Sequence, residues 1–145
     1  MTNQKSFVEA RNGMIEREPK PRERGVNYVR AHKTLGQYFA DFLTCYGALT
    51  DIVKLGTNQL TFIPEDEIKK AIQFSHDHGV RVAIGNPIMD QALSAGSQAT
   101  RDVIDYAARL GLDIMEISVI ARTIHDEDLA DLLDYVNGQG IKPIV

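Results

Sequence analysis

Short runs of β-branched and other apolar residues recur along this chain at intervals of about 25–33 residues. Each run has four or five residues, which is the length of a buried strand. We therefore predict five strands, at residues 26–30, 51–55, 80–84, 113–117 and 141–145. Because helix-length segments separate these runs, the pattern indicates βαβ units on a parallel sheet with right-handed connections.

The segments between the runs carry apolar residues at helical spacing, which predicts helices over residues 35–49, 64–78, 99–110 and 126–136. The second of these has the clearest boundaries, because Pro64 and three acidic residues form its first turn and Gly79 follows its end. The single cysteine, Cys45, falls within the first predicted helix, and we interpret it as a small core residue.

Two architectures share this order of elements. A five-stranded doubly wound parallel sheet suits a chain of 145 residues. A (β/α)8 barrel of the TIM-barrel type needs roughly 250 residues, so this chain would supply only its first five strands and four helices. The last predicted strand ends at Val145, with no helix after it to cover the sheet, and this favours the partial, truncated barrel. The strand order separates the two, because only the doubly wound sheet places strand one between strands two and three.

Composition narrows the class of protein further. The chain is 43% hydrophobic and 25% charged, with a formal net charge of -4, which is typical of a globular protein and argues against non-specific nucleic-acid binding. No apolar run approaches the roughly 18 residues of a membrane span. One cysteine and a polar N-terminus without a signal peptide indicate a cytoplasmic protein. We expect residues 1–19 to form a poorly packed arm and residues 20–145 to form the partial barrel domain.

Two charged residues interrupt the predicted strands close to their carboxyl ends, where both architectures place their functional groups. Lys54 lies in Asp-Ile-Val-Lys and Glu116 in Asp-Ile-Met-Glu, so each comes three residues after an Asp. Because both residues come three positions after the Asp that opens their strand, we predict that the two side chains lie at the same level of the sheet. In a barrel they would project into its mouth, with strand three between them. A close pair would keep Glu116 ionised. The alternatives are that Lys54 extends into water, or that the two form a purely structural ion pair.

Other residues also fall near predicted strand ends. Arg30 and His32 follow strand one, Asp90 lies four residues beyond Asn86 after strand three, and Ser118 follows strand four. We interpret Asp90 and Ser118 as candidates for substrate binding.

Four segments together resemble the phosphosulfolactate synthase family, in order and spacing, from about residue 19 to the C-terminus. They are Lys20-Pro-Arg-Glu-Arg-Gly25, Asp51-Ile-Val-Lys-Leu-Gly56, Gly79 and Glu116-Ile-Ser118. The resemblance implies a (β/α)8 barrel lyase that adds sulfite to phosphoenolpyruvate with Mg²⁺, in coenzyme M or sulfolactate biosynthesis. It makes Arg22 and Lys54 candidates for binding a small anionic substrate, and Glu116 a candidate for binding Mg²⁺ or orienting a base.

The loops at residues 31–33, 57–60 and 85–87 differ from the motifs usual in that family. Three hypotheses therefore stay open: the lyase, a divergent barrel enzyme acting on another phosphorylated or carboxylated small molecule, and a non-catalytic heat-stress-associated relative. A partial barrel also exposes a sheet edge, so we expect self-association into a homo-oligomer.

Overall fold

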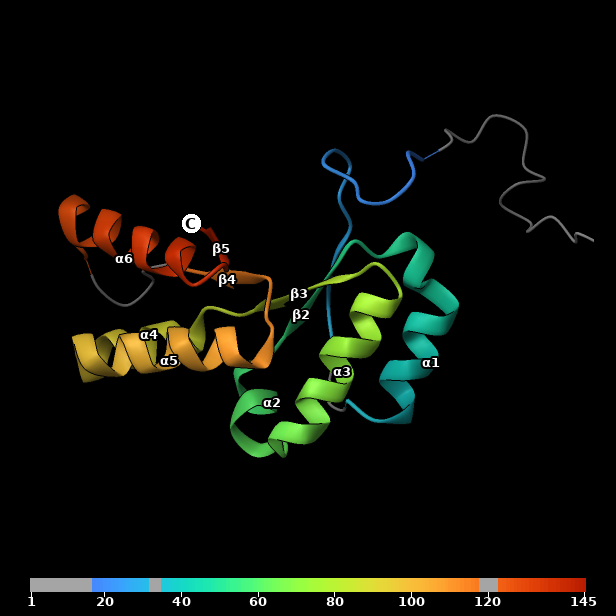
Figure 1. Ribbon diagram of the computed structural model, residues 1–145, viewed down its shortest axis with the longest axis horizontal. Coiled ribbons are helices and arrows are strands. Elements are labelled where there is room, and N and C mark those ends of the chain that lie inside the picture. The colour runs from blue at the N-terminus through green and yellow to red at the C-terminus, as the bar shows by residue number, and fades with distance from the viewer. Residues whose placement is uncertain (1–16, 32–34, 118–122) are drawn as a thin grey trace, which may run out of the picture.

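The computed structural model describes residues 17–31, 35–117 and 123–145. Within these ranges, one sheet contains five parallel strands in the order β1-β2-β3-β4-β5 (Figure 1). The strands are β1 (Tyr28–Arg30), β2 (Ile52–Leu55), β3 (Arg81–Ile84), β4 (Ile114–Glu116) and β5 (Lys142–Ile144). The sequential order confirms the barrel arrangement and shows that the doubly wound alternative is wrong, because β1 does not lie between β2 and β3.

All five strands lie inside their predicted ranges and begin one or two residues late. At Val80 and Ile141 the reason is visible. Their backbone N–H groups donate to carbonyls at the end of the preceding helix, those of Ser75 and Val136, so they close a helix instead of opening a strand.

Four helices confirm the predicted ones: α1 (Gln37–Tyr46), which continues into the 3-10 turn η1 (Gly47–Leu49), α3 (Glu65–Asp77), α5 (Ser97–Leu110) and α6 (Asp126–Gly138). Two shorter helices were not predicted, α2 (Thr57–Phe62) and α4 (Pro87–Ala95). Within the described ranges, none of the helices is long and apolar enough to cross a membrane.

The prediction that Cys45 belongs to the core is wrong, because its side chain is exposed. Helix α1 buries Phe39 and Leu43, which are four residues apart and share one face. Cys45 comes two residues after Leu43, which places it on the opposite face of the helix.

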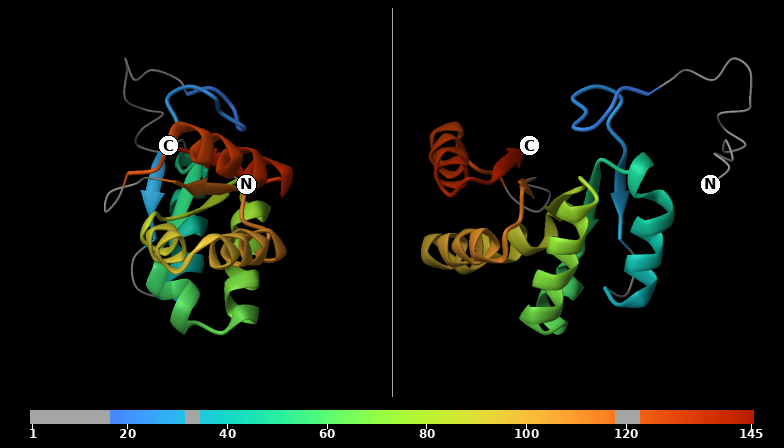
Figure 2. Two further views of the ribbon diagram at one scale, coloured as in Figure 1. Left: turned by 90° about the vertical axis from the view of Figure 1, so that its left-hand side faces the viewer. Right: turned by 45° about the vertical axis from the view of Figure 1, so that its right-hand side comes forward.

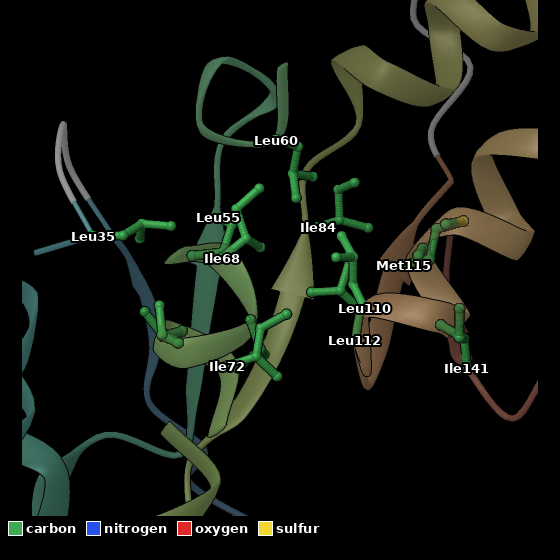
Figure 3. Packing of buried hydrophobic residues seen from close by; sticks show 14 of the residues in the cluster. Leu35, Leu55, Leu60, Ile68, Ile72, Ile84, Leu110, Leu112, Met115 and Ile141 are labelled. Atoms are coloured by element: carbon green, nitrogen blue, oxygen red, sulfur yellow. The ribbon is translucent and has the colours of Figure 1, made fainter. Parts of the chain in front are cut away.

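The main core lies between the sheet and the helices that cover its outer face (Figures 1 and 2). Figure 3 shows Leu55 of β2, Ile84 of β3 and Met115 of β4 pointing toward this helical layer, where Ile68 and Leu110 meet them. Each of the three strand residues is at most 1% exposed. Burial of this shared surface supplies the main stabilisation of the fold.

A second, smaller cluster occupies the inner face of the sheet. It contains Ile52, Ala83 and Ile114, all buried, with Val26 packed against them. These residues alternate along their strands with those of the outer core, as a period of two requires. The sheet therefore curves around an apolar inner layer and forms an open part of a barrel.

The segment before β1 is tied to the amino ends of the strands. Arg17 and Arg22 form ion pairs with Asp51 at 3.1 and 2.7 Å, and the backbone N–H of Asn27 donates to the same carboxylate. The motif that contains Arg22 thus lies beside the start of β1. Residues 1–16, most of the expected arm, lie outside the described residues.

Candidate active site

The ion pair between Lys54 and Glu116 is the centre of the candidate site. Lys54 extends from β2 and Glu116 from β4, and the Lys54 Nζ donates to Glu116 Oε2 at 2.5 Å. Their side chains are 25% and 20% exposed, so the pair lies at the surface of the inner face and is open to a ligand. The prediction that the two charged ends meet, with strand three between them, is confirmed. The prediction that they lie at one level is wrong, because Lys54 pairs with Ala83 and Ala83 pairs with Ile114, which comes two residues before Glu116.

Tyr28 of β1 is a third member of the cluster, and the sequence analysis missed it. Its hydroxyl donates to Glu116 Oε1 at 2.6 Å. Since β1 and β4 are separated by two strands, this contact requires the sheet to curve so that their inner faces approach each other. Side chains alternate between the two faces of a strand, so the position of Tyr28 along β1 indicated which face of the sheet it occupies. Nothing in the sequence indicated that its hydroxyl would reach β4.

Hydrogen bonding fixes the protonation state of Glu116. Burial raises the pKa of this carboxyl, but hydrogen bonds from Lys54, Tyr28 and the backbone N–H of Asn86 outweigh burial and hold the pKa below its usual range. Burial raises the pKa of Tyr28, and so does its hydrogen bond to Glu116. At neutral pH, Glu116 is therefore an ionised acceptor and Tyr28 a neutral donor.

Gly85, directly after β3, leaves room for the Lys54 side chain. A Cβ atom built at Gly85 would lie 2.8 Å from Lys54 Cε and 3.6 Å from its Nζ. Any larger residue would have to push the lysine aside. The strand that separates the two members of the ion pair thus lets Lys54 pass over it toward Glu116.

The structure does not bring Arg22 to this cluster. Its side chain is 9% exposed and is held at the amino end of β2 by Asp51 and by the carbonyls of Glu18 and Ala48. Lys54 and Glu116 lie at the carboxyl ends of their strands, so Arg22 belongs to the opposite edge of the sheet.

Asp90 does lie on the candidate side of the sheet, in the first turn of α4 after β3. Its Oδ2 accepts a hydrogen bond from Asn86 Nδ2 at 3.2 Å, and its Oδ1 is buried without a hydrogen-bond partner. Ser118, the remaining candidate, lies outside the described residues, as does His32.

The described donor set does not fit a Mg²⁺ ion. One oxygen of Glu116 accepts from an ammonium group and the other from a phenol, whereas Mg²⁺ takes carboxylate oxygens and waters directly. In the three described ranges, no group of three or more His, Cys, Asp or Glu side chains could hold a metal ion. Mg²⁺ therefore stays a prediction of the family resemblance.

A parallel sheet in sequential order that curves around a charged cluster at its carboxyl edge is the first part of a (β/α)8 barrel. Solved structures agree. D-psicose 3-epimerase from Clostridium cellulolyticum H10 is 13% identical, with a TM-score of 0.52 over 81% of this chain and 50% of its own. The 3-dehydroquinate dehydratase from Aquifex aeolicus VF5 is 17% identical, with a TM-score of 0.52 over the same shares. At these identities the likeness shows the fold alone.

The chain belongs to the (2R)-phospho-3-sulfolactate synthase (ComA) family, whose model matches residues 15–145. Protein HEAT-STRESS-ASSOCIATED 32 of Arabidopsis thaliana is 28% identical over 130 residues, covering 88% of this chain and 45% of that protein. The phosphosulfolactate synthase of Methanocaldococcus jannaschii is 27% identical over 96 residues, covering 66% of this chain and 38% of that protein. The chain thus spans less than half the length of these relatives.

Proposed function

We propose that this chain carries part of the active site of a lyase that adds sulfite to phosphoenolpyruvate. The observation that carries the proposal is the Lys54 ammonium, held against Glu116 at the carboxyl edge of a barrel sheet in a chain of this family. In barrels of this type, side chains at that edge perform the chemistry.

The reaction needs a cation at the position where charge develops. The sulfur of sulfite bonds to the methylene carbon of phosphoenolpyruvate, and the electrons of the double bond move to the carbon that bears the carboxylate. That carbon then takes up a proton. The Lys54 ammonium would stabilise the negative charge that spreads onto the carboxylate oxygens, and it is an acid from which the proton could come.

Glu116 and Tyr28 would position Lys54. The ionised carboxylate of Glu116 accepts the ammonium on one oxygen, and the Tyr28 hydroxyl holds the other oxygen at 2.6 Å. A long lysine side chain is otherwise free to adopt many conformers, so fixing it beforehand lowers the entropic cost of binding substrate.

Incubation of the protein in its full-length form with phosphoenolpyruvate, sulfite and Mg²⁺ tests the proposal. We expect phosphoenolpyruvate to be consumed only when sulfite is present, and Lys54→Ala to abolish that consumption while the far-UV circular dichroism stays unchanged. Phosphoenolpyruvate that is not consumed by the wild-type protein, or equal activity of Lys54→Ala, would contradict the proposal.

A second candidate is a family member without this reaction, supported by the match to the heat-stress-associated protein over 88% of the chain. In that case the folded protein leaves phosphoenolpyruvate unchanged with sulfite and Mg²⁺, and Lys54 and Glu116 form a structural pair. Their separate contributions would then appear in the unfolding free energy, measured for Lys54→Ala and Glu116→Gln.

A further inference from the structure

We propose that Arg30 of β1 is a second cation of this site and binds an oxyanion of the substrate, a carboxylate or a phosphate, beside the Lys54 ammonium. The inference rests on the proposed function and deepens it, because it names the group of the substrate that the first strand recognises. No motif of the family resemblance contains Arg30.

The register of the sheet places Arg30 beside Lys54. The two residues are paired across β1 and β2, so their side chains leave the same face of the sheet on adjacent strands. That face is the inner one, because Tyr28, two residues earlier on β1, reaches Glu116 from it. The backbone N–H of Ala31 donates to the carbonyl of Lys54 at 2.9 Å, which extends the pairing past Arg30 and fixes its backbone.

The charges of this face are not balanced by the described residues. Glu116 already accepts hydrogen bonds on both oxygens, from Lys54 and from Tyr28. The side chain of Arg30 is exposed, and among the described residues no acidic side chain forms an ion pair with it. Like charges opposite each other on neighbouring strands are unfavourable. An anion bound between the two cations would remove that repulsion.

The surroundings indicate a small anion. A guanidinium presents parallel N–H groups that match the oxygens of a carboxylate or a phosphate, whereas an ammonium acts as a point charge. The inner face around these cations is apolar: Ala83 and Ile114 continue the row of Arg30 and Lys54 across β3 and β4, and Ile52 lies two residues before Lys54 on β2. A small ligand with one strongly charged end and a short carbon body fits two cations that lie next to apolar side chains.

Isothermal titration of the folded protein with inorganic phosphate, and separately with pyruvate, tests the proposal. The variant is Arg30→Gln, and Arg30→Lys retains the charge without the planar fork. The matched control is Arg24→Gln, because Arg24 is also exposed and also lacks an ion pair among the described residues, but lies before β1 at the other edge. Thermal unfolding of each variant checks that the fold is kept.

We expect Arg30→Gln to weaken the binding of at least one of the two anions by tenfold or more. Arg30→Lys should weaken anion binding less than Arg30→Gln does, and the affinity of Arg24→Gln should stay within twofold of wild type. The probe that depends on Arg30 identifies the group as phosphate or carboxylate. If Lys54→Ala weakens binding but Arg30→Gln changes it no more than Arg24→Gln does, this inference is overturned and the proposed function stands. If the wild-type protein binds neither anion, this inference is overturned, whereas the proposed function is decided separately by the consumption of phosphoenolpyruvate.

Discussion

Lys54 shows how much the role of a single residue depends on its neighbours. An ammonium on an otherwise apolar strand is unfavourable unless it reaches water or a partner. Here Glu116 supplies the partner and Gly85 supplies the room, with a built Cβ only 2.8 Å from Lys54 Cε. Glu116 and Gly85 therefore account both for the stability of the lysine and for its position at the mouth.

We predict that Gly85→Ala displaces the Lys54 ammonium without unfolding the protein, because the atom that must move belongs to a flexible side chain. Phosphate binding should weaken about tenfold, equivalent to about 1.4 kcal/mol. Isothermal titration measures this directly. Gly56→Ala is the control, because a Cβ at Gly56 would meet its nearest atom, Gln59 Oε1, at an ordinary 3.5 Å. Equal affinities of the two variants would contradict the prediction.

Glu116 makes the stability of the fold depend on pH. Its pKa is lower in the folded protein than its usual value, so its contribution is complete above the ordinary glutamate pKa of about 4.3 and is lost as the pH falls through the folded value. We expect wild type to lose more unfolding free energy than Glu116→Gln between neutral pH and about pH 3.5. Urea unfolding at both pH values measures the difference. Asp51 titrates in wild type and in Glu116→Gln, so it contributes the same pH-dependent loss of unfolding free energy to both. Equal losses in the two proteins would refute the lowered pKa of Glu116.

At the scale of elements, the two edges of the sheet have separate tasks. The carboxyl edge holds the candidate site, and the amino edge holds the segment before β1 through Asp51, which is 4% exposed and paired with Arg17 and Arg22. Burial raises the pKa of Asp51, but hydrogen bonds from Asn27, Arg22 and Arg17 hold it below its usual range. This separation places the ion pairs that stabilise the fold at one end of the strands and the candidate site at the other.

We therefore predict that Asp51→Asn lowers the unfolding free energy by about 3 kcal/mol, because two arginines lose their buried partner. Anion binding at the carboxyl edge should stay within twofold. Denaturant unfolding and isothermal titration provide the two measurements. Asp66→Asn, at an exposed position of the first turn of α3, should cost less than about 1 kcal/mol and serves as the control. An anion affinity that falls in parallel with stability would show that the edges are not independent.

At the scale of the whole molecule, the described part of the sheet is open. There, β1 and β5 each pair with a single neighbouring strand, β2 and β4. Unpaired strand edges favour association with another chain. Next to the β5 edge, Ile144 and Val145 are 37% and 73% exposed.

We expect this 145-residue chain to self-associate, with a sedimentation coefficient that rises with protein concentration. Ile144→Lys should shift the association to higher concentration by placing a charge at the open edge. Phe62→Lys replaces a residue of α2 that is 78% exposed and far from either sheet edge in sequence, so it is the matched control. A single concentration-independent species for the wild-type chain would exclude this mode of assembly.

The sequence alone determined the order, type and approximate bounds of the five strands and four longer helices, because hydrophobic periodicity is a local property. It also determined that Lys54 and Glu116 share one face of the sheet near the carboxyl ends of their strands, because the alternation of side chains along a strand is a local property as well. Helices α2 and α4 escaped prediction because each is too short to establish a periodic stripe. Only the tertiary structure decided that Tyr28 reaches Glu116 and that Asp51 holds Arg22 at the opposite edge. Contacts of this kind join segments that are distant in sequence, and they depend on the curvature of the whole sheet, which arises from the twist and packing of all its strands together.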